Sequence, residues 1–394
     1  IAIGGYGALF WMWLIALVGG ATAFVESTLA QIYKKRSVKG GSYGGPAYYI
    51  QSAIGSRALG VVFAVALIAT YAVGFNMLAS FNLIDSMSSY HFYDTFVTAS
   101  GAHLLPIIGG ALLALLVGVC IFGNGNRIVK VTGVLVPVMG VLYIIMALIV
   151  MVLNAGMLPE VLRRIFQGAF DFKAIFGGAA GFGSSALMQG IKRGLYSNEA
   201  GVGSAPNAAA AADVSHPVKQ GLVQMLSVFI DTILVCSATA MMCLCTGIEP
   251  SESLKGAPFV QASLEHTFGV VGPYFITIAL LLFAFTTLLG NLFYCEGCLN
   301  YIAGRTLSHR QMNVFHAFAC VVVFVGAQMK FGLVWDIADV LMGIMALINL
   351  PVILRLGGTA MHALSDYMKQ RHEGKDPVFR AKNIGLKEQT DYWN

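Results

Sequence analysis

Charged residues are scarce in this chain. Of its 394 residues, 11% are Asp, Glu, Lys or Arg, and 57% are hydrophobic. A soluble fold usually has about a quarter of its residues charged, so the composition excludes a soluble globular protein and predicts an integral membrane protein. The formal net charge of +5 comes from short basic clusters between apolar runs. Because they form no continuous basic face, they predict no nucleic-acid partner.

Other chemical signals are also missing. The 7 cysteines lie mostly inside apolar runs, where they act as small hydrophobic residues, and we expect no disulfide. Cys295 and Cys298 have the spacing of a metal site, but no second pair or histidine cluster accompanies them. There is no Walker loop, zinc-protease helix or nucleophile elbow. The sequence therefore predicts neither an enzyme nor a bound cofactor.

Long apolar runs are abundant instead. An apolar helix needs roughly 20 residues to cross the hydrocarbon layer, and nine runs approach or exceed that length. They predict an all-α polytopic membrane protein. The expected spans are residues 8–32, 59–81, 104–122, 128–153, 174–191, 218–245, 270–301, 314–327 and 333–356.

The loops between these spans alternate in charge. Loops with basic residues, such as Lys192 and Arg193, alternate with loops that carry Asp or Glu. The positive-inside rule places the basic loops and the C-terminus in the cytoplasm, although Arg163 and Arg164 lie on the opposite side. We expect residues 1–368 to form one transmembrane transporter domain and residues 369–394 to form a polar, loosely ordered cytoplasmic tail.

One span carries an unusual density of helix-breaking residues. Within 174–191, glycines flank a phenylalanine and precede two serines; the candidate binding residues are Gly177, Gly181, Phe182, Gly183, Ser184 and Ser185. Small residues also allow close helix packing in membranes. So many within one segment nevertheless predict an interrupted helix, whose freed amides and carbonyls bind a small zwitterion and its coupling cation in a secondary transporter.

Polar residues also lie inside four other spans, and those of two spans have two interpretations each. Thr286 and Thr287 either bond back to carbonyls one turn earlier or supply oxygens to a hard cation, and spacing does not decide between them. Asp231 either binds a cation or proton or accepts bonds from the amides of a broken helix. For Glu26 we expect an interfacial ion pair with the Lys34 cluster, and for Asp339 a solvated face or gate.

Several motifs resemble one family. The segments GGYGALFWMWLIALVGG, GGPAYYI, KRGLYSNEAGVGSAPNAAAAA, HPVKQGLVQMLSVFIDT and VWDIADVLMGIMAL are similar to those of the alanine or glycine:cation symporters of bacteria and archaea. The resemblance implies a LeuT-type inverted-repeat fold with alternating access. Such proteins have about eleven spans, so it also implies an N-terminally truncated chain in which the first core helix is missing.

The resemblance also implies a function and its site. It indicates sodium-coupled symport of alanine or glycine across the plasma membrane, with membrane lipid as the surroundings and sodium as coupling ion rather than cofactor. The substrate is expected between Gly177 and Ser185, closed in by the rings of Phe182 and Trp335. Thr286 and Thr287 are the implied sodium ligands. Proton coupling through Asp231, and a channel or non-transporting sensor, are the alternatives.

Overall fold

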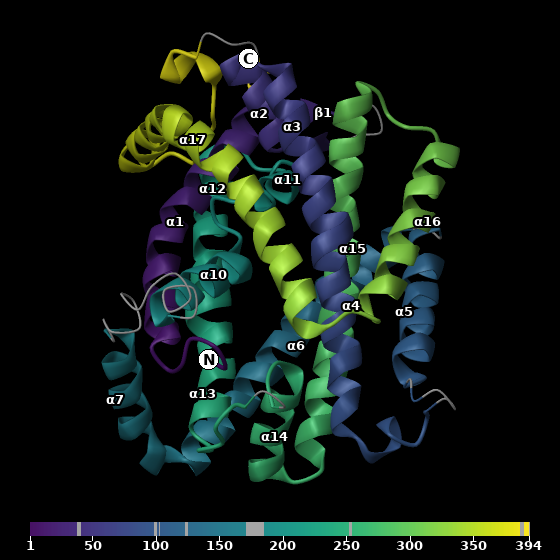
Figure 1. The fold of residues 1–394 in the computed structure, drawn as a ribbon. Coiled ribbons are helices and arrows are strands. Elements are labelled where there is room, and N and C mark those ends of the chain that lie inside the picture. The colour runs from purple at the N-terminus through teal and green to yellow at the C-terminus, as the bar shows by residue number, and fades with distance from the viewer. Residues whose placement is uncertain are drawn as a thin grey trace.

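The protein is almost entirely helical in a computed structural model (Figure 1). A two-stranded antiparallel hairpin, β1 (Lys35–Arg36) with β2 (Ser42–Tyr43), is its only sheet among the described residues. The structure describes residues 1–37, 41–97, 101, 103–122, 125–170, 185–251, 254–386 and 390–393.

Six helical segments are long and apolar enough to cross a membrane. They are α1 (Ala8–Ile32), the helical run Arg57–Ser89, Val136–Leu153 of α6 (Gly125–Leu153), the run Pro217–Leu244, α15 (Val271–Ala303) and α17 (Phe331–His372). The run Arg57–Ser89 comprises α3 (Arg57–Ile68), η2 (Ala69–Phe75), α4 (Asn76–Asp85) and η3 (Ser86–Ser89), and the run Pro217–Leu244 comprises α12 (Pro217–Val228), η6 (Phe229–Cys236) and α13 (Ser237–Leu244).

Two further expected spans correspond to shorter or more polar helices. Residues 104–122 form the apolar α5 (Leu105–Ile121), and residues 314–327 lie in α16 (His309–Gly326). Most of the expected span 174–191 lies outside the described residues, so nine crossings stay a prediction. The remaining helices are α2 (Pro46–Tyr49), η1 (Ile50–Ile54), η4 (His91–Tyr93), η5 (Ala155–Met157), α7 (Leu158–Ala169), α10 (Ala186–Asn198), α11 (Ala205–Ala209), α14 (Ala257–Phe268) and η7 (Ala381–Ile384).

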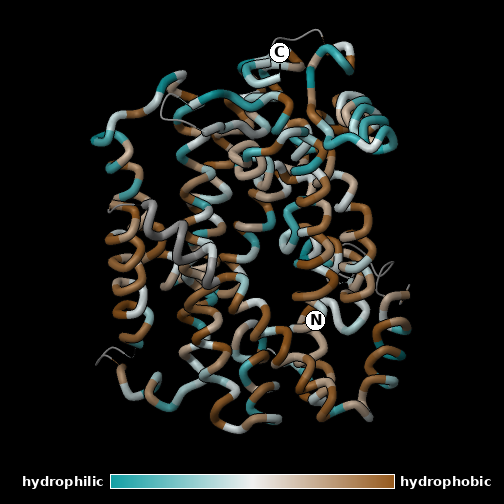
Figure 2. The backbone as a smooth tube through the Cα atoms, turned by 180° about the vertical axis from the view of Figure 1, so that it is seen from behind, coloured by the Kyte–Doolittle hydropathy of each residue, from teal (hydrophilic) through white to brown (hydrophobic). Residues whose placement is uncertain are grey.

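The outer surface of the helices is apolar. On α5 the side chains of Leu115 and Val119 are 64% and 67% exposed, and on α17 Leu347 and Leu354 are 76% and 78% exposed. Figure 2 shows hydrophobic colour along the long helices and hydrophilic colour near the C-terminus. Large apolar side chains facing outward in such numbers suit a lipid environment, and the chain is a multi-pass membrane protein.

Glycines on two helices allow a close approach to α1. A Cβ built at Gly190 of α10 would lie 2.5 Å from the Ala8 carbonyl oxygen, and one at Gly194 would lie 2.1 Å from the side chain of Ile15. At Gly221 of α12 a Cβ would lie 2.2 Å from the Thr28 hydroxyl. Small residues at such contacts let helix backbones meet, and α1 is therefore held between α10 and α12.

Two transmembrane runs contain π-helical segments in their middle. The segment η2 interrupts the run from α3 to α4, and η6 interrupts the run from α12 to α13. A π-segment displaces backbone carbonyls from their usual partners and often marks a functional region. Here η2 carries the buried Tyr71 and η6 carries Asp231, so each π-segment includes a polar side chain within an apolar run.

The C-terminal residues pack firmly, and the expectation of a loosely ordered tail is wrong for the part that the structure describes. Trp393 is 8% exposed, and its indole Nε1 donates to the Gln31 carbonyl at 2.8 Å. The Lys34 ammonium lies 4.6 Å from the ring centre of Tyr392 and 5.0 Å from that of Trp393. The tail thereby covers the end of α1, because cation–π contacts and a buried indole hold it there.

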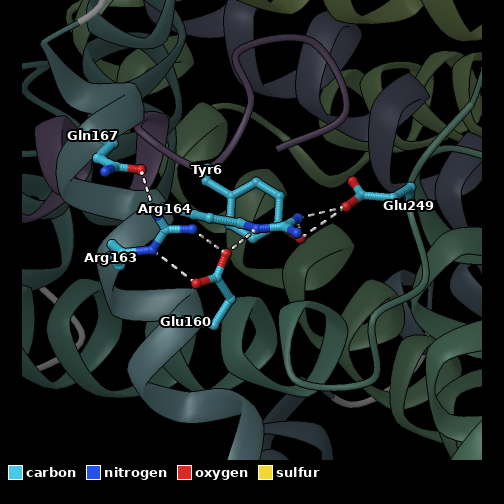
Figure 3. Close-up of polar contacts among 6 residues, drawn as sticks. All are labelled: Tyr6, Glu160, Arg163, Arg164, Gln167 and Glu249. Atoms are coloured by element: carbon cyan, nitrogen blue, oxygen red, sulfur yellow. Dashed lines mark hydrogen bonds and ion pairs between the residues drawn. The ribbon is translucent and has the colours of Figure 1, made fainter.

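Arg163 and Arg164, the two arginines on the side opposite to the basic loops, pair with nearby carboxylates (Figure 3). Glu160 accepts from Arg163 at 2.7 Å and from Arg164 at 2.9 Å, and Arg164 also pairs with Glu249 at 2.9 Å. Hydrogen bonds from both arginines lower the pKa of Glu160 to about 2. Because acids of the same region balance these positive charges, the pair is compatible with an outward-facing position.

Candidate functional site

The predicted substrate segment is only partly described. Gly177, Gly181, Phe182, Gly183 and Ser184 lie outside the described residues, so their role stays a prediction. Ser185 is 2% exposed and caps α10, since its hydroxyl accepts from the Met188 N–H at 3.3 Å. Its proposed contact with substrate is likewise untested.

The helix that follows is longer than expected. α10 ends at Asn198 rather than near residue 191, so Lys192 and Arg193 lie inside a helix and not in a cytoplasmic loop. Arg193 donates a hydrogen bond to Asp339 of α17, and the Lys192 ammonium lies 3.6 Å from the same carboxylate. Asp339 is thus not a solvated acid but the partner of two cations, and its role as a gate stays a prediction.

Trp335 lies beside this ion pair. The Arg193 guanidinium carbon is 4.4 Å from the Trp335 ring centre, and the rings of Tyr196 and Trp335 meet edge to face at 5.0 Å. The indole Nε1 of Trp335 is buried without a hydrogen-bond partner in the described part of the chain. An aromatic side chain so placed has an apolar ring and a free donor on an interior surface.

A chain of rings continues inward from Trp335. The ring centres of Tyr196 and Phe75 are 5.1 Å apart, and those of Phe75 and Tyr71 are 4.9 Å apart. The ring centres of Tyr71 and Tyr294 of α15 are 5.6 Å apart. Aromatic pairs at these distances stabilise each other beyond their buried area. The array joins α10, η2, α15 and α17 around one interior region.

The two predicted sodium ligands differ in their contacts. The Thr286 hydroxyl donates to the carbonyls of Leu282 and Phe283, both at 3.0 Å. This is the hydrogen bond to a carbonyl one turn earlier that was one of its two interpretations. Thr287 is exposed. It shares one face of α15 with Asn291 and Tyr294, four and seven residues later. Asn291 is 4% exposed and donates to Asn76 at 2.9 Å, so this face is buried at Asn291 and open at Thr287.

Asp231 bonds to a side chain rather than to backbone amides. The Ser197 hydroxyl of α10 donates to Asp231, and it also lies 3.0 Å from the Thr232 hydroxyl. Thr232 accepts in turn from the Asn198 amide at 3.0 Å. The acid therefore anchors η6 to α10, and whether it also binds a cation or a proton stays untested.

Glu26 forms no ion pair with Lys34, and that expectation is wrong. Its side chain is fully buried, with Oε1 accepting from the Gly201 N–H at 3.2 Å and Oε2 from the Asn349 amide at 2.9 Å. Asn349 also donates to the Gly201 carbonyl at 3.0 Å and accepts from the Tyr49 hydroxyl at 2.5 Å. Glu26 and Asn349 therefore fix the turn that follows α10.

The sequence reasoning missed one acid at this turn. Glu199 follows α10 directly and is the only non-glycine residue with a positive φ, 53°, in the described ranges. The Ser204 hydroxyl donates to it at 2.5 Å. An acidic residue between a helix end and a glycine-rich turn was the available signal, but sequence alone gave no reason to separate it from an ordinary loop acid.

A cavity of about 930 Å³ opens near the hairpin and the C-terminal end of α15. Its lining includes Lys35, Arg57, Glu296, Asn300 and Tyr301. Among the residues that the structure describes, no group of three or more His, Cys, Asp or Glu side chains could hold a metal ion. The lining combines charged and polar side chains with apolar surface.

Comparison with known proteins identifies the family of this chain. The family model described as "Sodium:alanine symporter family" matches residues 1–381. The chain is 43% identical to the amino-acid carrier protein AlsT of Bacillus subtilis, over 98% of this chain and 79% of that protein. It is 36% identical to the sodium/alanine symporter AgcS of Methanococcus maripaludis, over 91% and 77%.

The name of a third relative mentions protons as well as sodium. The chain is 36% identical to the sodium/proton-dependent alanine carrier protein of Bacillus sp. PS3, over 100% of this chain and 88% of that protein. A match over almost the whole chain, on a helical membrane fold, identifies a transporter and not an enzyme. The chain belongs to the sodium:alanine symporter family.

Proposed function

We propose that this protein carries a small neutral amino acid, alanine or glycine, across the plasma membrane together with sodium. The observation that carries the proposal is the family match over residues 1–381, with relatives named as alanine carriers. The aromatic array around Trp335 supports it, because rings around a small site exclude larger side chains by bulk. The proposed transport mechanism is alternating access in a LeuT-type fold.

The proposed substrate site lies between α10 and α17. Gly177, Gly181, Phe182, Gly183, Ser184 and Ser185 are the proposed contacts from the segment before α10, with Trp335 opposite. The indole Nε1 of Trp335 supports this placement, because it is an unpaired donor beside the ring of Tyr196. Freed amides of an interrupted helix would bind the substrate carboxylate.

The proposed sodium ion lies against α15. Thr286 uses its hydrogen to bond back within the helix, which leaves its oxygen lone pairs available to a cation. Thr287 is exposed and shares its face of α15 with the buried Asn291 and with Tyr294 of the aromatic array, which supports a site on this face. Hard cations favour oxygen ligands of this kind.

The proposed orientation places the C-terminus in the cytoplasm. Basic residues gather at that end, including Lys34, Arg36 and Lys219, each of which contacts the C-terminal residues. Anionic lipid and the positive-inside rule favour such an end on the cytoplasmic side. The cavity near the hairpin would then be the cytoplasmic mouth of the transport path.

Uptake into proteoliposomes tests the function. Purified full-length protein, with any residues that precede Ile1, should concentrate labelled alanine under an inward sodium gradient, and replacement of sodium by choline should abolish the accumulation. Unlabelled glycine should compete. A channel or a sensor would equilibrate alanine or leave it outside, so accumulation above the external concentration distinguishes a carrier from both. Absence of any alanine movement would refute the proposal.

Proton coupling is the second candidate, favoured by the name of the relative from Bacillus sp. PS3. In the same liposomes, an inward pH gradient without sodium would drive alanine accumulation. Uptake that needs sodium and ignores the pH gradient would exclude this candidate.

A further inference from the structure

The helix α17 is much longer than a membrane crossing requires. Its 42 residues extend over about 63 Å at 1.5 Å per residue, whereas the hydrocarbon layer is about 30 Å thick. Residues 331–350 alone would cross that layer. Pro351 follows them inside the helix, and the second part of α17, residues 352–372, therefore has to lie outside the hydrocarbon layer or along its surface.

The second part of α17 runs in a different direction from the first. Proline removes a backbone hydrogen bond and is a usual cause of a sharp kink in a helix. Figure 1 shows the yellow second part almost end-on near the C-terminus, whereas α15 runs from one end of the molecule to the other. Because the long helices cross the membrane, a helix that lies across their ends follows the membrane surface.

One face of this surface segment packs on the protein. Leu356 and Ala360 are buried. The Asp366 carboxylate lies 3.3 Å from the Nε2 atom of His216, and the rings of Tyr367 and His216 meet edge to face at 5.1 Å. His216 is the N-cap of α12. These contacts fix the segment to the start of a transmembrane run, so its opposite face is presented outward.

The outward face carries apolar side chains. Leu354 is 78% exposed and Met361 is 52% exposed. Together with the exposed Val340 and Leu347 of the first part, they follow at intervals of about two helical turns. Residues at this spacing share one face of a helix. The apolar stripe that suits lipid in the first part of α17 therefore continues into the second part.

Basic side chains flank this stripe in the second part. Arg355, His362 and Lys369 are exposed and recur at the same interval as the apolar residues. None of the three forms an ion pair or a side-chain hydrogen bond within the described part of the chain, although other basic residues near the C-terminus do. A row of basic groups without carboxylate partners attracts an anion.

The two stripes together favour a lipid over a soluble anion. A phosphate ion in water would need only the basic groups and would leave Leu354 and Met361 exposed to water. A surface helix with an apolar face and flanking Lys or Arg binds the interface of an anionic bilayer. Long basic side chains can lay their carbon chains along apolar surface while the charge reaches the head groups.

We propose that residues 352–372 form a surface helix that binds anionic phospholipid. Leu354 and Met361 enter the upper acyl region, and Arg355 and Lys369 bind head-group phosphates with His362 between them. In the proposed orientation the lipid belongs to the cytoplasmic leaflet. This inference goes beyond the proposed transport function and does not depend on it.

The first test measures where Met361 lies. A spin label at Met361→Cys is introduced into the full-length protein, in a background without accessible cysteines, and the protein is placed in nanodiscs of phosphatidylcholine and phosphatidylglycerol. Oxygen, which concentrates in hydrocarbon, should relax this label more than a water-soluble nickel complex does. A label at Glu373→Cys, an exposed site in the turn after α17, should show the reverse. Equal behaviour of the two labels would overturn the membrane contact.

The second test measures the preference for anionic lipid. Phosphatidylglycerol added to the protein in detergent should raise the apparent melting temperature of the wild type. The double variant Arg355→Gln/Lys369→Gln should need at least about tenfold more phosphatidylglycerol for half of this rise, because each basic group near an anionic surface contributes to binding. The double variant Arg380→Gln/Lys382→Gln removes the same charge from exposed residues of the tail and should behave as the wild type.

The outcomes separate the possible ligands. Phosphatidylcholine and soluble glycerol phosphate should give no comparable rise in the wild type. An equal rise with glycerol phosphate would replace the lipid by a soluble anion, and an equal rise with phosphatidylcholine would remove the role of charge; each overturns the proposal. So would an Arg355→Gln/Lys369→Gln variant that responds to phosphatidylglycerol as the wild type does. Neither test measures transport, so failure of the proposed symport would leave both results interpretable.

Discussion

Asn349 joins three elements through one buried amide, and its replacement by leucine gives the sharpest test of the core geometry. The amide donates to Glu26 and to the Gly201 carbonyl and accepts from Tyr49. Asn349→Leu would leave these three buried groups without their partner. At about 1 to 3 kcal/mol for each unpaired group, the loss is about 3 to 9 kcal/mol of stability.

The assay is the apparent melting temperature of purified protein in detergent. It is measured as the temperature at which the monodisperse peak in size-exclusion chromatography is lost. A loss of this size should lower the midpoint by roughly 5 °C or more. Asn313→Leu is the matched control, because Asn313 is exposed on α16 and surface changes usually alter stability by less than about 0.5 kcal/mol. If both variants melt at the wild-type temperature, the hydrogen-bond network around Glu26 does not stabilise the turn after α10.

Four more variants test the site, the topology and the tail. Thr287→Val keeps the side-chain volume and removes one oxygen, so the sodium concentration for half-maximal alanine uptake should rise at unchanged expression; an unchanged sodium dependence would rule out Thr287 as a ligand. Trp335→Ala removes the ring beside Tyr196 and should weaken alanine binding or admit bulkier amino acids in competition assays, whereas unaltered selectivity would place the substrate elsewhere. Met368→Cys, in a background without accessible cysteines, should be protected from an impermeant thiol reagent in intact cells, and ready labelling would reverse the orientation. Trp393→Ala should expose the end of α1 to limited proteolysis at the 34–36 segment, and an unchanged cleavage pattern would show that the tail does not cover it.

Most transmembrane helices could be predicted from the sequence, because a segment that crosses the hydrocarbon layer must be long and apolar. The structure places helices at the expected spans except 174–191, most of which lies outside the described residues. The end of α10 was predicted too early because Lys192 and Arg193 resembled a cytoplasmic loop. Local sequence could not show that Asp339, 146 residues beyond Arg193, neutralises that charge inside the protein.

The substrate and sodium ligands stay predictions, and the contacts of the buried polar residues were the part that sequence could not predict. An interrupted helix and paired threonines are local signals, and the motifs of the family are long enough to identify it. Glu26 was assigned to Lys34 because the two are close in the sequence. Its partners Gly201 and Asn349 come from distant segments, and only packing of α1 against the turn after α10 and against α17 brings them together.

The amino-acid sequence alone predicts that this protein is helical, lies in a membrane and belongs to a transporter family, because hydropathy and motifs depend on residues that are close together in the chain. Tertiary structure decided where each buried charge finds its partner. It also decided that the C-terminal residues fold back onto α1 and that the Ser204 hydroxyl donates to Glu199. Hydropathy acts residue by residue, whereas the pairing of a buried polar group depends on which distant elements share its surface.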